Sequence, residues 1–123
     1  MLTCVSTFAQ CFSPDTSHRK TATLVKKDYK KYKQNLCDYS KFKDSKDAKE
    51  LLCKANYYFS IGGYSNSIDC LKQAYTKGFS AEFKFQILKL MLANNKQLGD
   101  NKEIEFYQEK INRVLEKFPE IDK

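Results

Sequence analysis

Tryptophan is absent from this chain, and glycine and proline are scarce, with four Gly and two Pro among 123 residues. Sandwiches and barrels of short strands need frequent turns, and those turns rely on glycine and proline. The composition therefore argues against an all-β fold. Long apolar runs are also missing, because no stretch approaches the roughly 20 apolar residues of a membrane-spanning helix. We expect no transmembrane segment.

Motifs that would carry a reaction are missing too. The sequence has no glycine-rich phosphate loop, no Gly-x-Ser-x-Gly elbow and no His-Glu-x-x-His pair. Its one histidine, His18, follows Cys4 and Cys11 at intervals of seven, which is not the ligand spacing of a zinc site. We therefore predict no enzymatic activity, no metal site and no cofactor.

The five cysteines form an odd set without a Cys-x-x-Cys pair, and they lie within or beside apolar segments: Cys4, Cys11, Cys37, Cys53 and Cys70. Secreted domains stabilised by disulfides usually carry an even, closely spaced set. The start of the chain also lacks the basic residues that open a secretory signal. These features predict reduced thiols in an intracellular compartment, either cytoplasmic or mitochondrial.

Basic residues outnumber acidic ones by 22 to 15, which gives a net charge of +7, but only Arg19 and Arg113 are arginines. Such a balance favours acidic partners, nucleic acid or an anionic surface, although bidentate recognition of phosphate usually uses arginine. Hydrophobic residues make up 41% of the chain, enough for one folded domain of ordinary size.

Apolar and aromatic side chains recur at steps of three and four from the first third of the chain onward, at Val25, Tyr29, Tyr32, Leu36 and Tyr39. This spacing predicts a long basic helix over residues 17–43 with one buried face, preceded by an N-terminal extension at 1–16.

Two helix pairs are predicted to follow, over residues 45–77 and 80–118. Gly62-Gly63 and Gly99 separate the helices within each pair, and Asp44 or Ser45, and later Ser80, can cap helix N-termini. The helix expected from Ala81 to about Leu98 carries apolar residues on nearly every side, so it packs against several neighbours or presents an apolar surface to a partner. The predicted fold is all-α, with five helices in a single domain over residues 17–123.

The stretch LLCKANYYFSIGGYSNSIDCLKQAY resembles a tetratricopeptide repeat. Leu51 matches the residue that opens the first helix of the family, Ala55 is small where the two helices cross, and Tyr58 matches a position that packs inward. After the glycine turn, the second helix keeps the small, apolar, small pattern at Ser67, Leu71 and Ala74. The resemblance implies helix pairs stacked as a short right-handed array. The second pair departs from the family, since Lys89 falls at a small-residue position and the Gly99 turn comes late, so a plain helical bundle is the alternative.

In tetratricopeptide repeats the first helix of each pair lines a concave groove that binds a peptide or another subunit. The resemblance implies that six residues face this groove, with Phe83 as a further apolar contact: Lys49, Asn56, Ser60, Gln86, Leu90 and Asn94. Some members clamp a partner's carboxylates with several polar residues of the groove. Of these, only one has a counterpart in this chain, Asn56, because Leu52 and Ile87 are apolar at two of the other positions. An apolar groove favours a permanent protein partner.

The function expected is therefore non-catalytic: a protein-interaction module, acting as an adaptor or accessory structural subunit of a larger intracellular assembly. The alternative is an RNA-contacting subunit of a ribonucleoprotein complex. Its contact surface would be the lysines of the first helix, Lys26, Lys27, Lys30, Lys31 and Lys33. Because Tyr29 and Tyr32 share the apolar stripe, we expect them to face the core rather than to stack on bases.

Overall fold

Helix pairs joined by glycine turns make up most of the structure, a computed structural model that describes residues 28–33 and 37–122. Four long helices follow one another along the chain: α3 (Lys46–Ser60), α4 (Tyr64–Lys77), α5 (Ala81–Leu98) and α6 (Asn101–Lys117). Residues 28–33 form a further helical segment, and the described ranges contain no strand. The all-α prediction with five helices is confirmed.

The helix ends follow from local sequence chemistry. The Ser45 hydroxyl accepts a hydrogen bond from the Ala48 amide at the start of α3, and Ser80 does the same for Phe83 at the start of α5. Gly99 ends α5 with φ +72°, a left-handed conformation that costs glycine little. Asp100 then caps α6 by accepting from the Glu103 amide. These ends lie close to the predicted boundaries of the two pairs.

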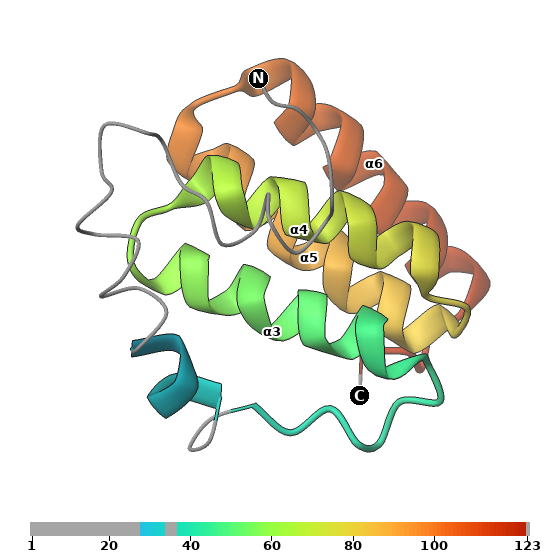
Figure 1. Cartoon of the computed structure of the whole chain (residues 1–123). Coiled ribbons are helices and arrows are strands. Elements are labelled where there is room, and N and C mark those ends of the chain that lie inside the picture. Colours follow the sequence, from blue (N-terminus) through green and yellow to red (C-terminus); the bar gives the residue numbers. More distant parts are fainter. Residues whose placement is uncertain (1–27, 34–36, 123) are drawn as a thin grey trace.

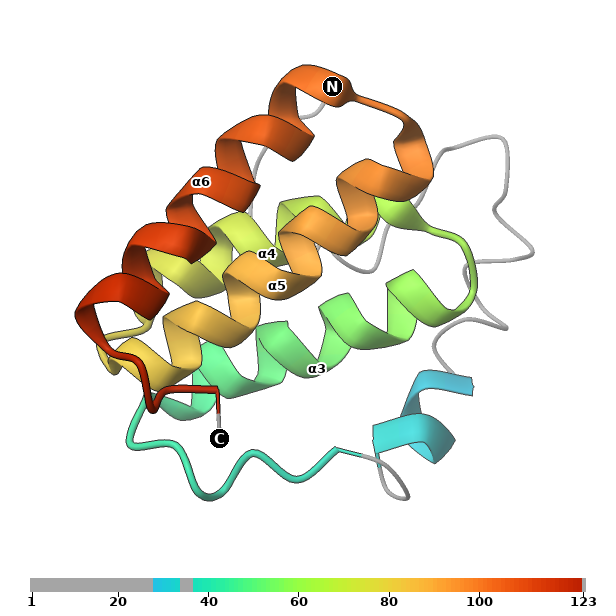
Figure 2. The ribbon, with the colours of Figure 1, turned by 180° about the vertical axis from the view of Figure 1, so that it is seen from behind.

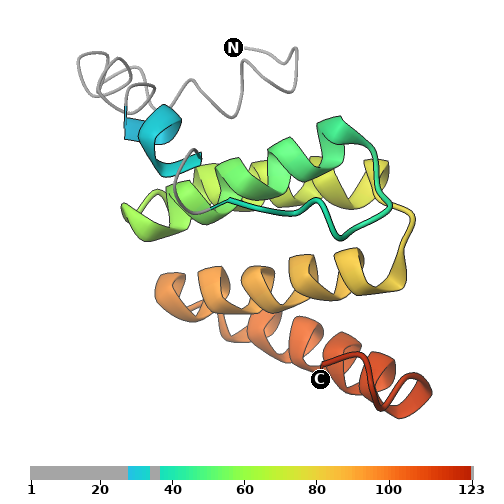
Figure 3. The same ribbon diagram turned by 90° about the horizontal axis from the view of Figure 1, so that it is seen from below.

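The helices are arranged as two antiparallel hairpins, one stacked on the other. Figure 3 shows the α3–α4 hairpin in one layer and the α5–α6 hairpin in the next. Helix α4 packs on both α3 and α5, whereas α6 packs on α5 and makes no backbone contact with α4. The helical segment 28–33 lies beside α3 on the outer side of the first layer (Figures 1 and 3).

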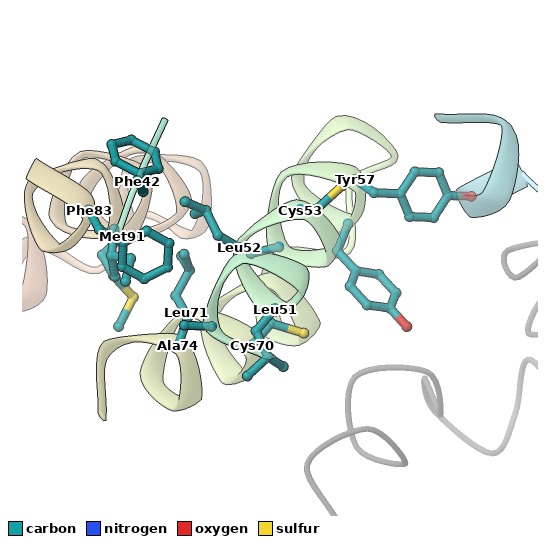
Figure 4. Close-up of a cluster of buried hydrophobic side chains, with 14 of the residues drawn as sticks. Phe42, Leu51, Leu52, Cys53, Tyr57, Cys70, Leu71, Ala74, Phe83 and Met91 are labelled. Atoms are coloured by element: carbon teal, nitrogen blue, oxygen red, sulfur yellow. The ribbon is translucent and has the colours of Figure 1, made fainter. Parts of the chain in front are cut away.

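The core forms two clusters on either side of α5. Phe83, Ile87 and Met91 join the larger cluster with residues of α3 and α4 (Figure 4), and Phe85 and Leu88 join a smaller one with Ile111 of α6. The apolar residues on several sides of α5 are thus explained by packing against three helices. The two helices of the first hairpin meet at small side chains, since Ala55, Ser67 and Ala74 have no exposed surface.

The predicted first helix is wrong over its last part. Residues 37–45 are not helical but run as an extended and turned segment along α3, which Figure 2 shows at the lower edge of the molecule. The Asp38 carboxylate accepts from the Ser40 amide and hydroxyl, and such a side-chain turn competes with helix formation. Phe42 inserts against Phe83, with ring centroids 5.5 Å apart. The predicted extension 1–16 and most of helix 17–43 lie outside the described residues.

The expectation that all cysteines are reduced is also wrong. Cys37 and Cys53 form a disulfide, with their Cα atoms 6.0 Å apart, and Cys70, fully buried on α4, is disulfide-bonded as well. The pairing follows from the course of segment 37–45, because a chain that turns back along α3 brings Cys37 next to Cys53. Helical spacing alone could not show it.

Among the helices of the described ranges, none has the length and apolar character that crossing a lipid bilayer requires.

Candidate partner-binding groove

A hollow of about 230 Å³ lies between α3 and α5, with segment 37–45 as its side wall. Asn56 of α3 and Gln86 and Leu90 of α5 line it together, so the structure brings three of the predicted groove residues to one place. The other lining residues are Tyr39, Leu52, Lys89 and Ala93. Of these, only Leu52 was expected at a groove position. The apolar part of this hollow comes from Leu52, Leu90 and Ala93.

A second hollow, of about 600 Å³, continues the first toward the start of α5. Gln86 and Lys89 line both hollows, so the two adjoin and are described together as one groove. The second part is strongly charged, and its other lining residues are Lys41, Phe42, Lys43, Ser80, Glu82, Ile121 and Asp122. The Lys89 ammonium is 2.8 Å from the Asp122 carboxylate, and both side chains are half exposed. The groove thus joins an apolar half to a half of mixed charge.

Segment 37–45 uses two of the predicted groove residues to hold its own place. The Lys49 ammonium donates to the Phe42 carbonyl at 3.2 Å, and the Asn56 amide donates to the Tyr39 hydroxyl. Neither group is therefore fully available to a partner. A sequence pattern based on helix faces misses this wall, because the wall is not a helix.

The Tyr39 hydroxyl gives the groove a polar group in a mainly apolar setting. Burial raises the pKa of Tyr39 to about 12, with a further rise from Tyr32 and an opposing effect of the Asn56 hydrogen bond. The phenol consequently stays protonated at neutral pH. Because it accepts from Asn56, its own proton remains available for donation to a bound group.

Four predicted groove residues line neither hollow, namely Lys49, which is bonded to Phe42, and three others. Ser60 is exposed at the end of α3, where its hydroxyl donates to the Tyr57 carbonyl. Phe83 and Asn94 are fully buried, so the expectation that they face an open groove is wrong. The resemblance to tetratricopeptide repeats implied these positions, but Phe83 lies in the larger core cluster and Asn94 donates to the Ser67 hydroxyl of α4.

Asn94 instead links the two hairpins. Its amide donates to the Ser67 hydroxyl at 2.9 Å and to the Leu90 carbonyl at 3.0 Å, and the Ser67 hydroxyl donates to the Ala55 carbonyl at 2.8 Å. Buried polar groups need such partners to offset the loss of water. The chain of bonds joins α3, α4 and α5 and fixes the position of α5 beside the groove.

The lysine surface is described only in part, since Lys26 and Lys27 lie outside the described residues. Lys30 and Lys31 are exposed, and the Lys33 ammonium pairs with the Glu50 carboxylate. The tyrosines between these lysines point to the core, as their spacing predicted. Tyr29 and Tyr32 both meet the ring of Tyr57 edge-on, with centroids 5.6 Å and 5.4 Å away.

Another lysine, Lys54, is buried close to this contact, with 2% of its surface exposed. Burial lowers its pKa to about 8, against the opposite effect of Glu50, while the positive charge of Lys33 lowers it further. Glu50 also accepts a hydrogen bond from the Tyr29 hydroxyl. This group of charges joins the helical segment 28–33 to α3 and lies apart from the groove.

The described part of the chain holds no group of three or more histidine, cysteine, aspartate or glutamate side chains placed to bind a metal ion. No family model, curated protein or solved structure matches the chain.

Proposed function

We propose that this protein is a non-catalytic protein-interaction module, an adaptor or accessory structural subunit that holds a segment of a partner in the groove between α3 and α5. The observation that carries the proposal is the shared location of Asn56, Gln86 and Leu90 in one hollow. An apolar strip with polar groups at its border is the usual make-up of a protein interface.

A tetratricopeptide-like array is the architecture we propose for this role. Its support is the stacking of two antiparallel hairpins and the full burial of Ala55, Ser67 and Ala74, the small residues of the first pair. The second pair is less regular, since Lys89 lies on the groove and pairs with Asp122. A plain bundle of the same helices would offer the same groove, so the proposed binding does not depend on the family.

The groove favours a partner segment with an apolar centre. Leu52, Leu90 and Ala93 supply the apolar surface, and the Tyr39 hydroxyl supplies a donor beside it. Lys41, Lys43 and Lys89, together with Glu82 and Asp122, line the charged half and would select the orientation of the segment. Because Cys37 and Cys53 are paired, a reducing compartment is no longer part of the proposal.

The test is affinity purification of the tagged protein with two substitutions of equal charge change. Leu90→Lys places a charge in the groove, whereas Gln108→Lys adds one to the exposed face of α6. We expect stoichiometric partners to be retained by wild type and Gln108→Lys and lost by Leu90→Lys, with unchanged circular dichroism. Partners that survive Leu90→Lys would count against the groove, and recovery of the chain alone would count against a subunit role.

The alternative, RNA contact by the first helix, has the exposure of Lys30 and Lys31 in its favour. Ribonuclease treatment during the purification separates it from protein binding. If lysines there contact phosphates, replacing one should lower the slope of log affinity against log salt by about 0.7 on single strands. An unchanged slope would exclude that contact.

A further inference from the structure

A further hollow, separate from the groove between α3 and α5, lies on the other side of α5 between α4 and α6. It has a volume of about 260 Å³. Its floor is formed by Ile87, Leu88 and Met91 of α5, all buried. Tyr75 of α4 and Tyr107 and Phe106 of α6 form the walls, and Lys72, Thr76 and Lys110 complete the lining. The hollow lies where α4 and α6 both pack on α5 while their backbones do not contact each other.

The wall residue Phe106 is unusually exposed for a large apolar side chain, with 49% of its surface in contact with solvent. Its ring meets that of Tyr107 edge-on, with centroids 5.0 Å apart. Exposed aromatic side chains beside an apolar cavity are typical of the centre of a protein interface.

The rim of the hollow is positively charged. Lys72 and Lys110 line it, and the Lys84 ammonium lies 5.0 Å from the centre of the Tyr75 ring. The ion pairs found in residues 28–33 and 37–122 involve other cations, namely Lys33, Lys89 and Arg113. Glu103 lies near Tyr107, so one carboxylate accompanies the lysines. An occupant with its own carboxylates would complement this rim.

The size of the hollow decides between kinds of occupant. Sites for small molecules usually measure about 300–1,000 Å³, so this one is small for a whole ligand and suits a single large side chain. The apolar side chains of its floor have no hydrogen-bond donor for a phosphate. We propose that the α4–α6 hollow binds an acidic segment of a partner protein, which inserts one large apolar side chain between Tyr75 and Phe106 and places flanking carboxylates at Lys72 and Lys110.

The proposal can be tested with short peptides on the isotope-labelled full chain. The probe is an acetylated Glu-Glu-Ser-Phe-Ser-Glu-Glu peptide with a fluorophore, and its controls replace either the phenylalanine by serine or the glutamates by lysine. We expect amide shifts that centre on α4, α5 and α6 around the hollow. Both control peptides should bind about tenfold more weakly or worse. The serine control lacks the side chain that fills the hollow, and the lysine control places positive charges beside Lys72 and Lys110.

Two variants locate the binding. Thr76→Phe fills the hollow from an exposed position and should abolish the shifts, while Lys72→Glu/Lys110→Glu should reverse the preference toward the lysine peptide. Lys46→Glu/Lys102→Glu makes the same charge change at exposed positions outside the hollow and should leave binding within about twofold.

Three results would overturn the proposal. Equal binding of the serine-centred peptide would mean that charge alone attracts it. Shifts confined to other surfaces would place the site elsewhere. Displacement of the peptide by a single-stranded RNA of mixed sequence would make the rim a phosphate site. None of these results bears on the α3–α5 groove, because Leu90→Lys leaves this hollow untouched.

Discussion

Asp44 is the residue on which the non-helical segment depends most. Asp44 is 5% exposed, and its carboxylate accepts three hydrogen bonds, from the amides of Phe79 and Ser80 and from the Ser80 hydroxyl. One side chain thereby joins the end of segment 37–45 to the start of α5. Burial acts to raise the pKa of Asp44, but these bonds outweigh it and hold the pKa below its ordinary value of 3.8.

Replacing Asp44 by alanine should lower the free energy of unfolding by about 2 kcal/mol, because two amides and a hydroxyl lose their acceptor. Since the folded pKa is depressed, this stabilisation is present above the unfolded pKa and disappears as pH falls through the folded pKa. The difference in unfolding free energy between wild type and Asp44→Ala, measured by urea denaturation, should thus shrink as pH falls below about 4.

The matched control for this prediction is Asp69→Ala, which removes an exposed carboxylate on α4 and should cost less than about 0.5 kcal/mol at every pH. A difference between wild type and Asp44→Ala that stayed constant down to pH 2 would show that the carboxylate charge is not what stabilises this junction.

At the scale of elements, segment 37–45 marks the limit of what periodicity can predict. Tyr39 and Phe42 continue the apolar spacing of a helix, yet both are used by an extended chain whose rings stack on each other 5.9 Å apart. The spacing was satisfied by a different geometry because Asp38 turns the chain locally and Cys37 is tied to α3. Neither the Asp38 turn nor the disulfide leaves a periodic pattern in the sequence.

The helices and their ends, by contrast, follow from short-range rules. Ser45, Ser80 and Gly99 act where they were expected, since capping depends only on residues within one turn. Helix α4 starts at Tyr64 without a side-chain cap. The groove residues were expected from the resemblance to tetratricopeptide repeats. Asn56, Gln86 and Leu90 line one hollow, but packing decides which side of α5 faces α4, and Phe83 and Asn94 are buried.

The disulfide gives the segment a measurable stability. Replacing both Cys37 and Cys53 by alanine releases a loop with a sequence separation of 16, which should lower the free energy of unfolding by about 3 kcal/mol. The double substitution is preferable to added reductant, because Cys70 is also disulfide-bonded. Urea denaturation under non-reducing conditions is the measurement. Unchanged stability would mean that Cys37 and Cys53 are not paired in the folded protein.

At the scale of the whole molecule, stability is distributed unevenly. Helix α3 contributes eight buried residues and α6 contributes one, Ile111. Because the backbone of α6 contacts that of α5 but not those of α3 and α4, α6 can detach while the first hairpin and α5 keep their contacts. The molecule should therefore open from its α6 end.

Native-state hydrogen exchange measures this opening. We expect the amides of α6 to exchange with a smaller opening free energy than those of α4 and α5. Ile111→Ala should speed exchange in α6 by about tenfold or more, because truncation of a buried isoleucine costs at least about 2 kcal/mol, while α3 is unaffected. Asn112→Ala, at an exposed neighbouring position, is the control. A single opening free energy shared by all four helices would contradict the prediction.

The central position of α5 also limits which substitutions the sequence can accept in evolution. Gln86 and Leu90 line the groove, Ile87 and Met91 line the α4–α6 hollow, and Phe83 and Asn94 are fully buried. Few positions of α5 are thus free to vary without altering one of these surroundings. The outward side of α6 lines neither the groove nor the hollow, and its residues are exposed, for example Gln108, Asn112 and Glu116. In a lineage that keeps this fold, α5 should be the slowest helix to diverge and the outer side of α6 the fastest.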